Sequence, residues 1–173
     1  ALAVEYYRKA ADQGLASARN ALGHCLRLGT GVAKDEWEAT AQFKMAAEQG
    51  HGEAQLNLGY AYYRGSGVRK DDVEAVRWYR KSANQGNVVA QNNLACCLRD
   101  GEGCPKDIAE AVELFEKSAA AGDPNAQCSL GSLYENGDGV RHDLQRAVSL
   151  YQSSARQGHA TARENLRRLG KSW

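Results

Sequence analysis

The feature that most constrains the fold of this chain is an internal repeat of 36 residues. Glycines recur at this step as Gly14, Gly50, Gly86, Gly122 and Gly158. Leucines recur in the same way as Leu22, Leu58, Leu94, Leu130 and Leu166. Self-similarity at such a period predicts identical supersecondary units that bury their apolar faces by stacking on one another. We place the repeats at about residues 1–34, 35–70, 71–106, 107–142 and 143–173.

Within each repeat the pattern predicts two helices. In the segment 74–85 the apolar residues recur at steps of three and four, which is helical spacing. Asp71 and Glu74 form a capping box, in which we expect the aspartate to accept from a free amide and the glutamate to bond back to the cap. The recurring glycine then ends the first helix, and a Gly-x-Gly turn ends the second. Asp123 followed by Pro124 predicts the start of a second helix.

Two sets of equivalent positions in the repeats, one aromatic and one small, predict how the helices pack. Aromatic bulk is expected between helices at Tyr7, Phe43, Tyr79, Phe115 and Tyr151. Small residues stand in one column of the second helix at Gly23, Gly59, Ala95 and Gly131. The expected fold is therefore all-α, a right-handed α-α superhelix (solenoid) of five helix-turn-helix repeats forming one domain over residues 1–173. We expect this domain to be part of a longer protein.

The residues of several repeats resemble the Sel1-like repeat (SLR) family, a relative of the tetratricopeptide repeats. The resemblance rests on AAEQG at 46–50, AQLNLGYAYYRGSGV at 54–68, AVRWYRKSANQG at 75–86 and LGSLYENGDGV at 130–140. The family implies a TPR-like α-solenoid that acts as an adaptor or scaffold and binds a partner protein or peptide in its concave groove. An alternative is a structural spacer module of a larger multidomain protein or enzyme.

Residues that could carry chemistry form no recognised catalytic motif, so we expect no enzyme activity and no cofactor. A cysteine-rich branch of the SLR family is associated with penicillin binding and β-lactamase activity, which leaves that activity as a remote alternative. That branch pairs cysteines within each repeat. Here the five cysteines, Cys25, Cys96, Cys97, Cys104 and Cys128, do not repeat in such pairs.

The cysteines and histidines favour structural roles. Cys25 and Cys97 are interpreted as small buried hydrophobes, and Cys96 with Cys128 is the one candidate disulfide. The sequence contains no C-x-x-C pattern, which is the spacing that would indicate a metal site. His51 and His159 follow the glycines that end helices, where we expect capping roles. Trp37 and Trp78 are expected to pack between repeats.

Charge and hydropathy limit the partners that this chain can bind. The 22 Lys and Arg residues nearly balance the 21 Asp and Glu residues, which argues against broad nucleic-acid binding. No apolar run is long enough to insert into a membrane. The odd cysteine count slightly favours an intracellular reducing compartment. The oligomeric state cannot be predicted.

The exposed face of the first helices is where we expect a partner to bind. Its charge is most positive in the third repeat, at Arg77, Arg80 and Lys81. Lys44 and Met45 of the second repeat adjoin it. Arginine forks suit carboxylates, so we expect an acidic segment or a C-terminal carboxylate to bind here. Met45 and Trp78 are expected to add apolar contact.

Overall fold

The computed structural model describes residues 2–172, which form ten helices and no strand. The first helices of the repeats are α1 (Leu2–Asp12), α3 (Glu36–Glu48), α5 (Asp72–Asn84), α7 (Ile108–Ala120) and α9 (Leu144–Arg156). The second helices are α2 (Ala16–Leu28), α4 (Gly52–Arg64), α6 (Val88–Asp100), α8 (Pro124–Asn136) and α10 (Ala160–Arg168). The prediction of an all-α fold with two helices in each repeat is confirmed.

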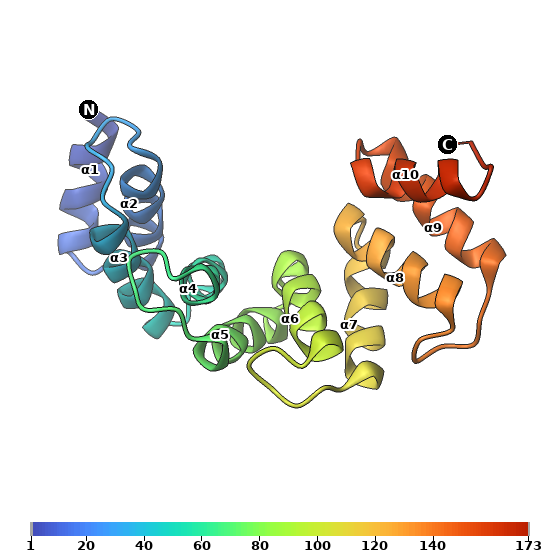
Figure 1. The fold of residues 1–173 in the computed structure, drawn as a ribbon. Helices are drawn as coiled ribbons and strands as arrows, with labels where there is room; N and C mark the ends of the chain where they lie inside the picture. Colours follow the sequence, from blue (N-terminus) through green and yellow to red (C-terminus); the bar gives the residue numbers. More distant parts are fainter. Residues whose placement is uncertain (1, 173) are drawn as a thin grey trace. The chain divides into compact units, whose positions relative to one another are not determined.

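The helices form two compact units that divide between Asn87 and Val88. The N-terminal unit contains α1 to α5, and the C-terminal unit contains α6 to α10. Within each unit, helices that follow one another in the chain pack side by side (Figure 1). From α3 onward, each first helix therefore lies against the second helix of the preceding repeat, as α5 lies on α4 and α9 lies on α8.

The first helices begin at the aspartates that the sequence predicts. The carboxylate of Asp71 accepts a hydrogen bond from the amide of Glu74 at 3.0 Å. The same bond caps the other first helices at Asp35, Asp107 and Asp143. Each bond satisfies an amide that no carbonyl of its own helix can reach.

The expectation that the capping-box glutamate bonds back to its cap is wrong at Glu74, and it is equally wrong at Glu38, which stands three residues after Asp35 in the same pattern. The amide of Asp71 instead donates to the carbonyl of Tyr62 in α4 at 3.0 Å. Equivalent bonds join Asp35 to Leu26, Asp107 to Leu98 and Asp143 to Tyr134. Because the preceding helix already satisfies the cap amide, the glutamate carboxylates bind elsewhere, and Glu38 pairs with Arg8 of α1 at 3.2 Å.

The predicted ends of the first helices are also confirmed. Their glycines take left-handed backbone angles, with φ between 83° and 95° at Gly86 and Gly122 and at their counterparts. Three of the second helices, α4, α8 and α10, begin at a side-chain cap on the next residue. Asp123 accepts from the amide of Ala126 at 2.7 Å, with Pro124 at the first helical position. His51 and His159 cap α4 and α10 through Nδ1, as predicted.

Close packing in each unit depends on small residues opposite aromatic rings. Gly59 of α4 lies against the ring of Tyr79 in α5, and Gly131 of α8 lies against Tyr151 in α9. A Cβ on either glycine would stand less than 3.0 Å from a ring carbon. The aromatic residues of this column in the second to fifth repeats, Phe43, Tyr79, Phe115 and Tyr151, are at most 2% exposed. Tyr7 is the exception at 37%, because no described helix covers that side of α1.

Candidate functional site

The site predicted from the sequence lies in the N-terminal unit, on α3 and α5. We call Lys44 and Met45 of α3 together with Arg77, Arg80 and Lys81 of α5 the cationic surface. Lys44, Met45, Arg77 and Lys81 are exposed, whereas Arg80 is half-buried. Both helices pack on α4, so one scaffold positions the residues.

Trp78 supports two of the cations of this surface. Its side chain is 6% exposed and belongs to the buried core of the N-terminal unit. The Nζ atom of Lys81 lies 4.0 Å from the centroid of the indole, and the guanidinium carbon of Arg77 lies 5.8 Å from it. A cation over an aromatic face is held by the ring quadrupole. The indole therefore fixes the positions of Lys81 and Arg77 relative to α5.

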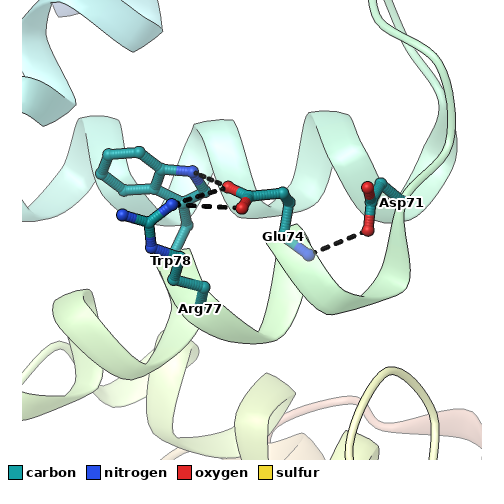
Figure 2. A network of polar contacts seen from close by, with 4 residues as sticks. All are labelled: Asp71, Glu74, Arg77 and Trp78. Carbon is teal, nitrogen blue, oxygen red and sulfur yellow. Dashed lines mark hydrogen bonds and ion pairs between the residues drawn. The ribbon is translucent and has the colours of Figure 1, made fainter.

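Glu74 completes this arrangement, and the charge pattern alone did not reveal it. Its carboxylate accepts from the indole Nε1 of Trp78 at 3.1 Å and pairs with Arg77 at 3.1 Å (Figure 2). Asp71, which caps α5, lies one turn before it (Figure 2). The spacing of three and four residues from Glu74 to its partners is the signal that could have predicted these contacts.

The structure corrects the roles expected for the tryptophans. Trp78 packs in the core as predicted, and because its side chain is 6% exposed it offers little apolar surface to a partner. Trp37 does not pack between repeats, because its side chain is 72% exposed at the start of α3. Met45 is 44% exposed, and its Sδ lies 2.6 Å from a guanidinium nitrogen of Arg19 in α2. Met45 is thus held toward α2 rather than toward α5.

None of the five cysteines forms a disulfide in this structure, and this includes the candidate pair Cys96 and Cys128. Cys97 and Cys128 are buried, and Cys25 is half-buried. Burial raises the pKa of the Cys128 thiol to about 11, and burial also raises the pKa of Cys96. Raised thiol pKa values are typical of structural cysteines rather than nucleophiles. Among residues 2–172, no group of three or more His, Cys, Asp or Glu side chains is placed to hold a metal ion.

The fold and the site define a class of protein, the α-helical repeat solenoids. The sequence model of the Sel1 repeat matches residues 1–15, 16–51, 52–87, 88–123 and 124–159. The chain therefore belongs to the Sel1 repeat family. The family frame begins each repeat at a second helix, so it groups α2 with α3 and α4 with α5.

Two solved structures are similar in both sequence and fold. A Sel1 repeat protein from Oxalobacter formigenes is 37% identical over 94% of this chain, with a TM-score of 0.86. A protective antigen of uropathogenic Escherichia coli that displays an SLR fold is 36% identical over 98% of this chain, with a TM-score of 0.86. This chain spans 66% and 37% of the lengths of those two proteins.

A cysteine-rich relative is more distant. Helicobacter pylori cysteine rich protein B is 26% identical over 72% of this chain and 89% of its own, with a TM-score of 0.56. No match was found among the curated proteins. Sel1 repeat proteins generally mediate protein–protein interaction, and their solenoid is typically a non-enzymatic scaffold. Between residues 2 and 172, no helix is both long and apolar enough to cross a membrane.

Proposed function

We propose that this chain is an adaptor that binds an acidic segment of a partner protein on the cationic surface and performs no chemistry of its own. The observation that carries the proposal is the placement of Lys81 and Arg77 on the indole of Trp78. Side chains fixed in this way lose less conformational entropy when a ligand binds than free lysine and arginine side chains do.

The charge of this group favours an anionic partner. Glu74 neutralises part of the charge of Arg77, but no described carboxylate lies within ion-pair distance of Lys81. The ammonium of Lys81 is therefore available for a carboxylate of the partner. The side chain of Arg77 is 60% exposed, and its guanidinium keeps donors that can face a ligand.

Fluorescence polarisation with a labelled peptide of alternating glutamate and leucine tests this proposal. The triple variant Arg77→Glu, Arg80→Glu, Lys81→Glu should lose binding at least tenfold, because each reversed charge repels the peptide. Binding by the native chain should also weaken as salt is added, since exposed charges are screened.

The control variant reverses three other exposed arginines, as Arg64→Glu, Arg69→Glu and Arg141→Glu. It changes the net charge by the same amount and should bind as the native chain does. Circular dichroism checks that both variants remain helical. If both variants lost the same amount of peptide affinity, the effect would be explained by net charge alone, and this would contradict the proposed site. A native chain that does not bind the peptide would contradict the acidic partner.

A further inference from the structure

A hollow of about 250 Å³ opens among α2, α3 and α4 of the N-terminal unit. The residues that line it include Arg27, the apolar Leu28 and Phe43, and Tyr60. It shares no residue with the cationic surface. Its size lies just below the range of about 300–1,000 Å³ that encloses drug-sized ligands, so it suits the end of a peptide chain.

Arg27 is a cation without an anionic partner among the described residues. Its Nε atom is buried and makes no hydrogen bond, and one terminal nitrogen lies 3.2 Å from Nδ1 of His24. Burial and the charge of Arg27 lower the pKa of His24, with an opposing effect from Glu53, so the imidazole is neutral near pH 7. A neutral ring cannot balance the guanidinium charge. Because Nε is buried, a ligand reaches this charge only at the terminal nitrogens.

The acid that lines the same hollow is already paired. Glu36 stands at the start of α3, and its carboxylate lies 2.7 Å from the ammonium of Lys34. No described carboxylate lies within ion-pair distance of Arg27. The hollow therefore presents one uncompensated positive charge beside apolar walls.

The C-terminal unit contains the equivalent hollow, and there the arginine is occupied. Arg99 stands two repeats after Arg27, and it lines a hollow of about 240 Å³ together with Lys106, the counterpart of Lys34. The guanidinium of Arg99 donates to both carboxylate oxygens of Asp100, at 2.8 Å from Nε and 2.7 Å from the terminal nitrogen. Leu28 stands where Asp100 would be in the N-terminal unit.

We propose that the hollow beside Arg27 binds the C-terminal carboxylate of a partner peptide that ends in an aliphatic residue. The carboxylate pairs with the guanidinium of Arg27, as Asp100 pairs with that of Arg99, but its oxygens accept from the terminal nitrogens because Nε of Arg27 is buried. The aliphatic side chain lies against Leu28 and Phe43. A chain terminus carries its carboxylate and its last side chain on one carbon, so both fit in a hollow of this size.

NMR chemical shift perturbation with N-acetyl-valine as the probe tests this site. We expect amide shifts at Ala39, Thr40 and Asn57, which line the hollow. N-acetyl-valinamide lacks the carboxylate and should cause no such shifts. An N-acetyl glutamate with an amidated α-carboxyl carries its charge on a longer side chain and should bind more weakly than N-acetyl-valine.

Three variants test the parts that Arg27 and Leu28 play in this hollow. Arg27→Gln removes the fork and should weaken binding about tenfold or more, because a carboxylate on arginine makes charge-assisted hydrogen bonds. Leu28→Asp places a carboxylate at the position that is equivalent to Asp100. The new carboxylate should pair with Arg27, as Asp100 pairs with Arg99, and so prevent the probe from binding. Leu28 is 64% exposed, so this change should leave the fold intact. Arg64→Gln removes an exposed arginine outside the hollow and should bind normally.

Several results would overturn the proposal. These are shifts of equal size with the amide probe, unchanged binding in Arg27→Gln, or no shifts at these residues at millimolar probe. Equal or tighter binding of the glutamate analogue would overturn the assignment to a chain terminus. The triple variant of the cationic surface should bind N-acetyl-valine normally, so failure of one site is distinguishable from failure of the other.

Discussion

Gly59 of α4 and Tyr79 of α5 approach each other so closely that a methyl group cannot fit between them. An ideal Cβ built on Gly59 lies 2.7 Å from Cδ1 of Tyr79 and 3.2 Å from the carbonyl oxygen of Ala75. Both neighbours belong to a helix that is packed in the core. The glycine therefore sets the distance between α4 and α5.

The first prediction is that Gly59→Ala destabilises the protein. Alanine favours a helix over glycine by about 1 kcal/mol, but overpacking against the ring costs about 1–3 kcal/mol, so we expect a net loss in the free energy of unfolding. Urea denaturation followed by circular dichroism measures it. Gly52→Ala is the matched control on the same helix, since its Cβ meets only the flexible side chain of Gln85, at 3.3 Å. A Gly59→Ala protein as stable as the control would show that α5 can shift at no cost.

The second prediction concerns the serine that joins neighbouring repeats. The hydroxyl of Ser154 in α9 donates to the carbonyl of Pro124 at the start of α8, at 2.6 Å. Ser154→Ala removes the hydrogen bond between the two repeats, although the carbonyl still accepts within α8, and should lower the free energy of unfolding by about 1 kcal/mol. Ser153→Ala is the control, because that hydroxyl bonds within its own helix, to Ser149. Thermal unfolding compares the two variants. Equal melting temperatures would contradict a stabilising role for the hydrogen bond between α8 and α9.

Local features of the fold could be predicted from the sequence because they depend on residues close together in the chain. The cap at Asp71 and the left-handed glycine at Gly86 each require one residue type at one backbone position. The burial of Trp37 and Trp78 was harder to predict, because it depends on neighbours from other helices. Val73, which stands in the column of Trp37, is also exposed, at 64%, and that column faces away from the packed helices.

The candidate site was predictable only in part. The cations of α5 were visible as charges, but the partners of Arg77 depend on how Glu74 and Trp78 are placed on the helix. The unpaired state of Arg27 could not be predicted, because it depends on three helices and on one side chain that differs between repeats. Only the comparison of Leu28 with Asp100 reveals it once the two hollows are known.

The third prediction is a pH titration of Asp100. Hydrogen bonds from Arg99, with added attraction from the charges of Arg99 and Lys106, hold the pKa of this carboxyl below its ordinary value. A lowered folded-state pKa stabilises the fold above the ordinary value of about 3.9, and this stabilisation is lost as pH falls through the folded-state pKa. We expect NMR to give a midpoint below about 3.9 in the native chain.

The variant Arg99→Gln is the control for this titration. It removes the charge and the bidentate hydrogen bonds, so the midpoint of Asp100 should rise toward its ordinary value. In the variant Leu28→Asp, the new carboxyl should titrate below its ordinary value, because it adjoins Arg27. An Asp100 midpoint that does not respond to Arg99→Gln would show that the guanidinium is not its partner in solution.

The fourth prediction is that Cys128 resists alkylation in the folded protein. With its pKa raised to about 11 by burial, its thiolate fraction at pH 8 is about a hundredfold below that of an ordinary thiol. Timed treatment with iodoacetamide and peptide mass spectrometry should find Cys128 modified slowly, and rapidly after unfolding in urea. Equal rates in folded and unfolded protein would contradict its burial in α8.

The bond from each cap amide to the preceding helix has a consequence for how such a chain can change in length. Each of the four turns from a second helix to the next first helix closes with the same bond, as Asp35 does on Leu26 and Asp71 does on Tyr62. Deletion of a whole period, such as residues 16–51, joins the end of one first helix to the start of a later second helix, and these two segments are equivalent to the ones that met before the deletion. Unequal recombination between copies of the coding sequence can therefore add or remove a repeat without requiring a new junction.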